Sequence, residues 1–571
     1  MATHHTPLHL AAAEVVATHA GIAATDLKVE APPRAELGDL AVGCFAIARA
    51  RKQNPAEVAR AIAAAFTPSE FLASATAAGP FVNFRADRTA AFRWVIESAL
   101  RSRLLPRELG TGKTICIDYG SPNISKHLAY HHIRGTMIGH ALAQTFRALG
   151  YRVVGINFLG DWGTTHGMLL AAWAHWGPIS PVDIAGLNKL YVRFRAAAKD
   201  DPALEQEGRD WFRRLEQGDP QARALWQQFR DVSWAEFREV YEILGIEYDE
   251  VRGESAYEPD IPRIFQTLTA RGLIKDSEGA QVVELPGEDN PILLRTRDGT
   301  SLYATRDVAS AEYRWDSYHF TRSLYVVDRG QSLHFRQLFK LLGLMGHTWV
   351  SHCEHIPYGL VRIDNQKSAT RLGNVVLMRD VFAIAEDMAR KVIHDINADM
   401  APELIPEVAR KVGIGAIVFG NLAPQRDKDI DFDIDQAVSL EGDSGPYVQY
   451  NHARCASVAR KASEIVASTD GIDLSLLTHD LEWAMARKLF DFPDVVVRSS
   501  EACEPHVICH YLLQLSADFA RYYSAGNTDK SLRILCDDPA LCRARLALTA
   551  AIRVTLRDGL DLLGITAPDE M

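Results

Sequence analysis

The sequence predicts an α/β fold built on a parallel sheet, with a small α+β domain before it and an all-helical domain after it. Two short apolar runs, Thr114–Tyr119 and Tyr151–Leu159, have the length and the boundaries of buried strands. Between them, Ile133–Leu149 carries apolar residues at helical spacing and stops at Gly150, a residue that favours helix termination. A strand, a crossover helix and a second strand form half of a doubly wound sheet, which binds its ligand at the carboxyl ends of the strands. We therefore expect the functional site in the loops that follow these two strands.

Length and composition indicate a multidomain globular protein. The chain of 571 residues is too long for one domain, and its 47% hydrophobic and 24% charged residues are ordinary for a globular protein in water. No apolar run reaches the ~20 residues of a membrane span. The opening MATHHTPLHL lacks the basic-then-apolar order of a signal peptide. We therefore expect a cytoplasmic protein that has no membrane partner.

Charge and cysteine content bear on the kinds of site to expect. The net charge of −11 does not by itself indicate a nucleic-acid-binding protein, although a large enzyme can still carry a local basic face. The eight cysteines include no C-x-x-C pair, so we expect neither a disulfide framework nor a zinc knuckle. A cluster of possible ligands lies close together in the sequence, but its spacing fits no common zinc pattern, and we expect no metal site. Its members are His347, His352, Cys353 and His355.

The first 88 residues are predicted to form the small α+β domain, and residues 89–110 a linker helix. Periodicity predicts helices at His9–His19, Asp39–Arg51 and Pro55–Phe66, and alternation predicts a strand at 78–85.

The remainder of the chain is predicted to contain the α/β domain, 111–381, a stem region, 382–440, and a helical domain, 441–571. Residues 180–246 interrupt the α/β pattern as a polar helical insertion with salt-bridge spacing. Within it, helices are expected at Asn188–Lys199 and Ala222–Leu244. Strand-like stretches then return to the sheet at Ala280–Leu285, Ile292–Thr296 and Leu324–Val327.

Several motifs carry a resemblance to one family. The stretches S121-P-N-I-S-K126, I133-R-G-T136 and G160-D-W-G-T164 resemble the first half of the catalytic domain of class I arginyl-tRNA synthetases. The sequence around Glu36–Phe84 is similar to the family's N-terminal appended domain, which contacts the corner of the tRNA. The helical C-terminal domain is similar to the family's anticodon-binding bundle. The resemblance covers essentially the whole chain.

The resemblance implies an enzyme that uses ATP, with Mg²⁺, to form arginyl-adenylate from L-arginine and then arginyl-tRNA. We expect the protein to be a monomer. An arginine substrate requires carboxylates for its planar guanidinium and acceptors for its α-ammonium. The resemblance places Asp118 and Asn123 at the ammonium and Glu254 and Asp307 at the guanidinium. The residues that it assigns to the lining of the same pocket are Tyr303 and Gln331.

The ATP-binding motifs depart from the family pattern. The resemblance implies Lys126, His132 and Lys367 as catalytic residues, the last in K367-S-A-T-R-L-G-N374. The residues that it implies at ATP are His132, Gly160, Asp161, Lys367 and Thr370. Where the family has His-x-Gly-His, this chain has Ala129-Tyr130-His131-His132.

Both changes in this motif predict a slower reaction. The loss of one transition-state donor, here at Ala129, typically lowers the rate ~10²–10³-fold. His131 adds a side chain where glycine lets the adenine lie flat, and overpacking a fitted site costs ~1–3 kcal/mol. Three functions therefore stay open at the level of the sequence. They are an impaired arginine–tRNA ligase, a non-catalytic paralogue that binds arginine or tRNA as a regulator, and a biosynthetic paralogue that activates arginine for another acceptor.

Overall fold

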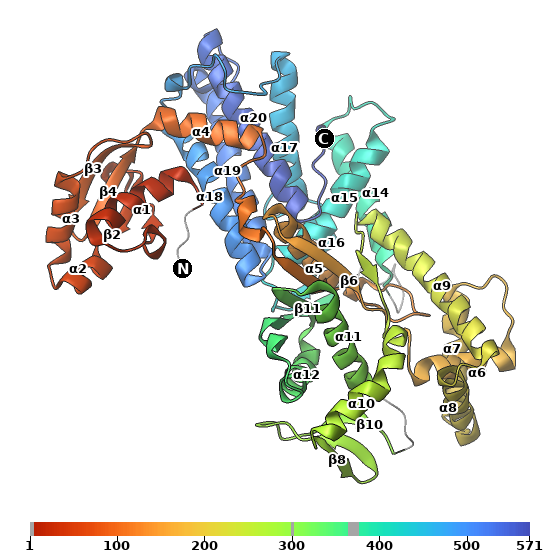
Figure 1. Ribbon diagram of the computed structural model, residues 1–571. Helices are drawn as coiled ribbons and strands as arrows, with labels where there is room; N and C mark the ends of the chain where they lie inside the picture. Colours follow the sequence, from red (N-terminus) through yellow and green to blue (C-terminus); the bar gives the residue numbers. More distant parts are fainter. Residues whose placement is uncertain (1–4, 298–301, 364–375) are drawn as a thin grey trace. The chain divides into compact units, whose positions relative to one another are not determined.

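The computed structural model describes residues 5–297, 302–363 and 376–571, which belong to two compact units (Figure 1). The first unit consists of Met1–Leu109, Ala389–Phe419 and Gln436–Met571. The second consists of Gly110–Met388 and Gly420–Asp435. A parallel sheet in the second unit and an all-helical C-terminal part of the first confirm the predicted fold class.

A five-stranded parallel sheet forms the centre of the second unit, with the strand order β12-β11-β5-β6-β7. The chain goes from β5 to β6 and β7 on one side and later adds β11 and β12 on the other. The order therefore reverses beside β5, which is where folds of this kind bind ligands. The strands are β5 (Thr114–Asp118), β6 (Arg152–Asn157), β7 (Glu250–Val251), β11 (Arg322–Asp328) and β12 (Cys353–Tyr358).

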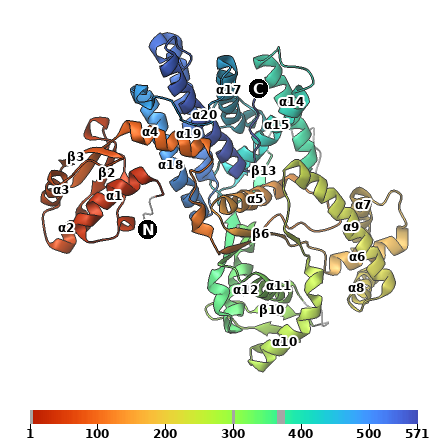
Figure 2. The ribbon, with the colours of Figure 1, turned by 45° about the horizontal axis from the view of Figure 1, so that its top comes forward.

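Helices cover both faces of this sheet. Helix α5 (Ile133–Ala148) connects β5 to β6 and lies on one side, whereas α11 (Tyr303–Tyr318) and α12 (Ser332–Leu344) lie on the other (Figures 1 and 2). On the α11 side, Cys116 and Val154 of the sheet share one buried apolar cluster with residues of α10 (Ile261–Ala270), α11 and α12. Helix α5 ends where the sequence predicts, because Gly150 has φ 85° and lets the Tyr151 amide donate back to the Phe146 carbonyl at 3.1 Å.

Four helices follow β6. They are α6 (Thr164–Trp176), α7 (Ile184–Ala198), α8 (Pro202–Glu216) and α9 (Pro220–Ile243). Two of them begin at an Asp-Pro pair, at Asp201 and Asp219, and each aspartate side chain accepts from a backbone amide of the first turn. The aspartate satisfies an amide that has no partner within the helix, and the proline that follows has the φ of a first helical residue.

A separate antiparallel sheet corrects one expectation from the sequence. Strands β8 (Ile274–Ser277), β9 (Ala280–Val283) and β10 (Ile292–Arg295) pair in the order β10-β9-β8, so the prediction that 280–285 and 292–296 return to the parallel sheet is wrong. Glu278 and Gly279 both have positive φ, 54° and 86°, and form a two-residue turn between β8 and β9. Such a turn closes a local hairpin, whereas a parallel pair needs a long crossover.

The first unit contains the N-terminal domain and the helical bundle. The N-terminal sheet is antiparallel, with the order β1-β2-β4-β3. The expected helix at Asp39–Arg51 is wrong in its first half, because Leu40–Gly43 pairs with two neighbouring strands and is largely buried. The elements here are α1 (Pro7–Ala20), β1 (Val29–Glu30), β2 (Leu40–Gly43), α2 (Phe45–Arg51), α3 (Pro55–Ala64), β3 (Leu72–Ala78), β4 (Phe81–Ala86) and α4 (Arg88–Leu100).

The C-terminal part of the chain is helical. Long helices, α17 (Gly445–Ala462), α18 (Asp480–Ala502), α19 (His506–Thr528) and α20 (Pro539–Leu562), form the bundle. The elements between the sheet and the bundle are β13 (Val361–Arg362), α14 (Met378–Ile396), α15 (Ile405–Leu422), β14 (Ile430–Asp431) and α16 (Ile434–Ala437). In the described ranges, no helix combines the length and the apolar character that crossing a bilayer requires.

Candidate active site

The loops after β5 and β6 are joined to each other at the carboxyl edge of the sheet. Asn123 and Gly160 form a parallel bridge, with the Gly160 amide donating to the Pro122 carbonyl at 3.0 Å and the Ile124 amide to the Gly160 carbonyl at 3.2 Å. Gly160 has a steric reason to be glycine, because a Cβ there would lie 2.0 Å from Asn123 Oδ1. The structure therefore brings two of the predicted site residues, Asn123 and Gly160, into direct contact.

Asp118, at the end of β5, is held in a buried ion pair. Its Oδ2 accepts from Arg314 Nη2 at 2.6 Å, and the two side chains are 6% and 1% exposed. Its Oδ1 accepts from Ser121 Oγ at 2.7 Å, and the same hydroxyl accepts from the Phe158 amide at 3.0 Å. The Asp118 charge holds the pKa of Arg314 above its usual value although burial acts in the opposite direction. Asp118 thus anchors the ends of β5 and β6 and α11 together.

The residues predicted at the guanidinium gather around α11. Glu254 opens a short 3₁₀ helix at Glu254–Asp260, and its Oε2 accepts from Arg306 Nε at 2.9 Å. Arg306 Nη1 donates to Glu258 Oε1 at 3.0 Å. Burial, with a smaller contribution from the charge of Asp307, raises the pKa of Glu254 to about 7 although Arg306 opposes the shift. Carboxylates from two different elements therefore face one small region.

Asp307 has a partner of its own. Its Oδ2 lies 2.7 Å from His334 Nε2, on α12. Burial lowers the pKa of His334, but the hydrogen bond and the charge of Asp307 outweigh it and raise that pKa overall. Tyr303 is 59% exposed, and its ring meets the His334 ring edge-on at 5.7 Å. Gln331 is exposed at the N-cap of α12.

Asp161, predicted at ATP, lies on the Glu254 side of this region. Its side chain is fully buried, and its two carboxylate oxygens accept from the Ser255 amide and hydroxyl, both at 2.9 Å. Arg230 Nε donates to the same carboxylate at 3.2 Å. Asp161 therefore holds the turn that presents Glu254.

The altered ATP motif, Ala129–His132, pairs through its first two residues with Val376 and Leu377. Ala129 forms an antiparallel bridge with Leu377, and the Tyr130 amide donates to the Val376 carbonyl at 2.8 Å. Lys367 and Thr370, the predicted residues of the second motif, lie outside the described residues. Val376 is the first described residue after them, so the chain that leaves the second motif pairs directly with the first.

The two histidines of this loop lie together. The ring centroids of His131 and His132 are 4.1 Å apart, with His131 exposed and His132 half-buried. Burial, together with His131 and Lys126, lowers the pKa of His132 to about 4. His132 Nδ1 lies 3.0 Å from the Ala129 carbonyl, which can only accept a hydrogen bond. Nδ1 therefore carries the proton, and the Nε2 atom of the neutral ring is an acceptor. Lys126 is exposed on the same loop.

Three family models match the chain in succession. They are described as an arginyl tRNA synthetase N terminal domain, residues 8–86, a class I (R) tRNA synthetase catalytic domain, residues 95–434, and a DALR anticodon binding domain, residues 448–571. The catalytic-domain match alone spans more than half of the chain. The chain belongs to the arginyl-tRNA synthetase family. The recognition made from the sequence motifs is therefore confirmed.

Similar proteins match this chain over nearly its whole length. An arginine–tRNA ligase of Lactobacillus acidophilus is 40% identical over 552 residues, which cover 95% of this chain and 96% of that protein. One of Exiguobacterium sibiricum is 41% identical over 549 residues, 95% of both chains. The solved arginyl-tRNA synthetase of Thermus thermophilus superposes with a TM-score of 0.81 at 26% identity, over 99% of this chain and 100% of that chain. Membership of this arginyl-tRNA synthetase family implies ATP as a substrate.

The paired residues around α11 form what we call the acid cluster. Its members are Glu254, Glu258, Arg306, Asp307 and His334. Three of them, Glu258, Arg306 and His334, were not singled out from the sequence. Arg306 immediately precedes Asp307, and Glu258 follows Glu254 by four positions, so both lie beside predicted residues. The need of a buried carboxylate for a partner is a signal that points to such neighbours. His334, on another helix, has no comparable signal, because its pairing with Asp307 arises only from the packing of α11 and α12.

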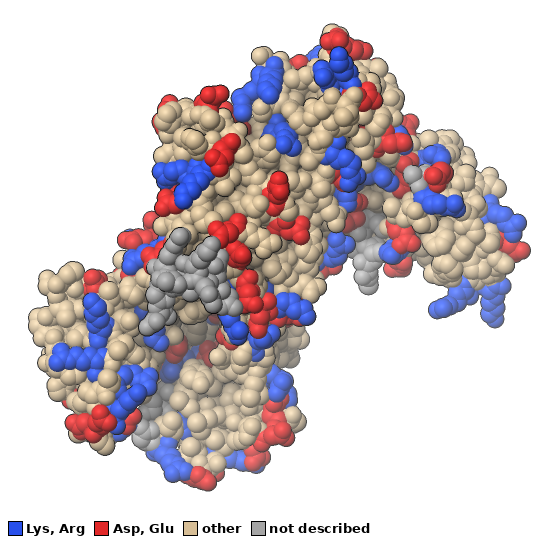
Figure 3. Space-filling view, turned by 180° about the vertical axis from the view of Figure 1, so that it is seen from behind, with Lys and Arg blue, Asp and Glu red and all other residues tan. Residues whose placement is uncertain are grey.

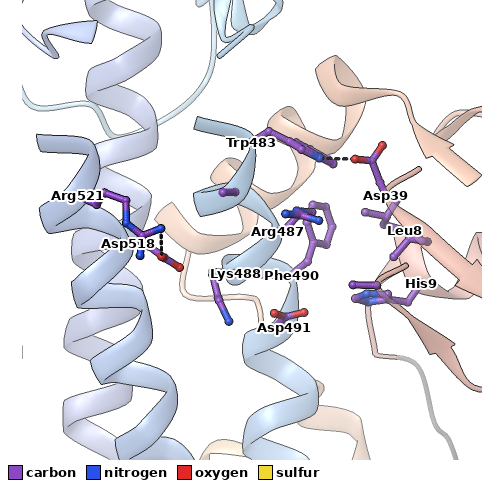
Figure 4. A pocket seen from close by; sticks show the side chains of 13 residues that line it. Leu8, His9, Asp39, Trp483, Arg487, Lys488, Phe490, Asp491, Asp518 and Arg521 are labelled. Atoms are coloured by element: carbon purple, nitrogen blue, oxygen red, sulfur yellow. Dashed lines mark hydrogen bonds and ion pairs between the residues drawn. The ribbon is translucent and has the colours of Figure 1, made fainter. Parts of the chain in front are cut away.

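A cavity away from this site lies within the first unit, between the N-terminal domain and α18 (Figure 4). Its volume is about 370 Å³. Asp39 accepts from Trp483 Nε1 at 2.6 Å, and Arg487, Lys488 and Asp491 of α18 line the same cavity. Burial raises the pKa of Asp491 to about 6. The cavity contains none of the predicted site residues, and we treat it as the boundary of two parts of this arginyl-tRNA synthetase.

Proposed function

We propose that this chain joins L-arginine to its tRNA through an arginyl-adenylate, with an adenylate step slowed by the altered ATP loop. The observation that carries the proposal is the group of carboxylates around α11, at the edge of the parallel sheet, in a chain whose three parts all match the arginyl-tRNA synthetases. A planar guanidinium needs two acceptor groups in fixed positions, and carboxylates from separate elements can supply them.

We assign the arginine side of the reaction to these residues. Glu254 and Asp307 accept hydrogen bonds from the guanidinium, and the exposed Tyr303 and Gln331 line its approach. Asn123 accepts from the α-ammonium. Asp118 contributes negative potential there and holds the loop through Ser121, since its own oxygens already accept from Arg314 and Ser121.

The ATP side is assigned to the joined loops. Lys126 and Lys367 stabilise charge on the phosphates, and His132, Gly160 and Thr370 contact ATP. Asp161, whose carboxylate accepts from Ser255 and Arg230, holds the loop after β6 beside them. The carboxylate of arginine attacks the α-phosphate, and pyrophosphate leaves. His132 can donate from Nε2 only when its ring is protonated, because Nδ1 donates to the Ala129 carbonyl. A pKa of about 4 makes that protonation unfavourable at neutral pH, which supports a slow step.

We further propose that Mg²⁺ enters with the phosphates of ATP and that the protein acts as a cytoplasmic monomer. Lys126, His131 and His132 are poor ligands for a hard cation, which prefers oxygen. Basic side chains on the face shown in Figure 3 are scattered among acidic ones, so this view indicates no single tRNA-binding surface.

The test is to restore the family pattern with Ala129→His and His131→Gly and to measure arginine-dependent pyrophosphate release with total tRNA present. We expect the double variant to gain about 10²-fold or more, because a missing transition-state donor costs about that much. Ala129→His alone should act mainly on kcat, and His131→Gly alone mainly on KM for ATP. Lys367→Ala in the restored protein should remove the gain.

Two outcomes would contradict this proposal. Full wild-type activity without a gain from restoration would mean that ATP binds differently in this chain. No activity after restoration would favour the second candidate, a non-catalytic paralogue that binds arginine or tRNA, for which Ala129 is the specific observation. Calorimetry of arginine binding distinguishes that paralogue from a protein that has lost the pocket altogether.

A further inference from the structure

Arg306 is a guanidinium of the protein itself that lies within the acid cluster. Its Nε donates to Glu254 Oε2 at 2.9 Å, and its Nη1 donates to Glu258 Oε1 at 3.0 Å. The Arg306 side chain is 4% exposed, whereas each glutamate is 18% exposed. The same carboxylate, Glu254, is proposed to receive the guanidinium of the substrate. A resident guanidinium at this position competes with any ligand that carries the same group.

The bridging arrangement limits this competition. A guanidinium can place two parallel hydrogen bonds on a single carboxylate, which is its strongest mode of pairing. Here Arg306 donates from Nε to Glu254 and from Nη1 to Glu258, so neither carboxylate receives the paired, parallel bonds of the strongest mode. Among the described residues, only Glu254 Oε2 accepts a hydrogen bond, and we take the other oxygen, Oε1, as the acceptor for a ligand.

The charges of the cluster show what Glu258 contributes. At a pH where all three are ionised, Glu254, Glu258 and Asp307 carry three negative charges against the one permanent positive charge of Arg306, and His334 pairs with Asp307. An excess of negative charge is therefore available for a substrate cation. Without Glu258, Arg306 and Glu254 form a neutral pair, and Asp307 is left as the main acceptor.

We propose that Glu258 is a positioning residue that holds Arg306 away from Oε1 of Glu254 and thereby sets the affinity and selectivity of the site for arginine. The inference rests on the proposed function, because it takes Glu254 to be an acceptor of the substrate guanidinium. Glu258 acts through Arg306 and does not contact the substrate. Its removal lets Arg306 place both hydrogen bonds on Glu254.

The first test measures L-arginine binding to the full-length protein by calorimetry, without ATP or tRNA. Glu258→Gln removes the charge but keeps an acceptor, and Glu258→Ala removes both. We expect affinity to fall about 10–100-fold for Glu258→Ala, as for the loss of a hydrogen bond to a charged group, and less for Glu258→Gln. Asp260→Asn is the matched control on the same 3₁₀ helix, because Asp260 pairs with the exposed Arg263. It should bind as wild type does.

The second test asks whether Glu258 acts through Arg306. In an Arg306→Met background, Glu258→Gln should have no further effect on arginine affinity, because the residue it positions is gone. If Arg306→Met fails to fold, Arg306→Lys serves instead, since a lysine cannot form the planar bridge. An unchanged affinity in Glu258→Ala, or an effect that persists fully in the Arg306 background, would overturn the proposal.

Selectivity gives a readout that a purely structural role would not move. Lysine presents a single ammonium and cannot use two carboxylates in the way that a guanidinium does. Glu258→Ala should therefore reduce arginine binding more than lysine binding, and an unchanged ratio would overturn the assignment of selectivity. A wild type that binds arginine but forms no adenylate would contradict the proposed function and leave these binding tests fully readable.

Discussion

Helix α11 carries two buried arginines, eight residues apart, that pair with acids in different ways. Arg314 is 1% exposed and pairs with one carboxylate, Asp118, which is 6% exposed. Arg306 is 4% exposed and is shared between Glu254 and Glu258, each 18% exposed. Arg314 also lies over the rings of Phe158 and Tyr325, at 5.7 and 4.9 Å.

We infer from this difference that the Arg314 pair holds the fold, whereas the Arg306 pairs prepare the proposed arginine site. At Arg314, one positive and one negative charge are enclosed together, with only 1% and 6% of the two side chains exposed. At Arg306, negative charge exceeds positive charge and the carboxylates reach solvent, so a cation from outside can be accepted. The number of acids and their exposure, more than the presence of a buried arginine, indicate which of the two can bind a substrate.

The largest expected effect is on stability, at the buried pair of Arg314 and Asp118. Arg314→Met should destabilise the protein by about 3–5 kcal/mol, because it leaves the buried Asp118 carboxylate without its partner. Thermal melting followed by circular dichroism measures the loss. Asp118→Asn in the same background should recover part of it, since the buried negative charge is removed. A melting temperature unchanged by Arg314→Met would remove the distinction between the two arginines.

The next largest effect is on arginine binding, at the acid cluster around Arg306. Asp307→Ala should weaken L-arginine binding about 10–100-fold, because a charge-assisted hydrogen bond to the guanidinium is lost. Wild type should also prefer arginine to lysine. Asp316→Ala is the matched control, since Asp316 is an exposed acid on the same helix. Equal binding by wild type and Asp307→Ala in calorimetry would show that the cluster is not the arginine pocket.

The smallest expected effect is a pH dependence of arginine affinity at the acid cluster. Glu254 has a pKa raised from 4.5 to about 7, by burial first and by Asp307, so its carboxyl is neutral below about pH 7 and charged above it. Arginine affinity should therefore fall as the pH is lowered from 8 to 6. The unfolded chain gives up this proton at lower pH, so the contribution of Glu254 to stability decreases as the pH rises from about 4.5 to 7.

His334 and Arg306 also face this carboxylate region, so a control is needed. His334 has a raised pKa and can change its charge at neighbouring pH values, while Arg306 stays charged. Glu254→Gln should remove most of the pH dependence of arginine binding if Glu254 is its source. A profile that keeps its shape in Glu254→Gln would assign the dependence to His334 or to Glu258, whose pKa is also raised by burial.

Local pattern predicted much of the fold. The bounds of β5, α5 and β6 follow the predicted runs closely, because a buried strand and a glycine-terminated helix are specified by neighbouring residues. The prediction was wrong at Leu40–Gly43, where pairing with two strands outweighs a helical pattern. The antiparallel sheet of β8, β9 and β10 was also assigned wrongly, because strand-like stretches do not reveal their partners.

What the sequence determined by itself was the α/β class, the family and the set of candidate residues, since periodicity and motifs depend on residues that are close along the chain. Only the tertiary structure decided how those residues are partnered. Arg306 and Glu254 are 52 positions apart, and Arg314 and Asp118 are 196 apart. Whether an acid is enclosed with its partner or left open to a ligand depends on the packing of helices against the sheet. Burial and distance determine how strongly these charged groups interact, and both are defined only in the folded chain.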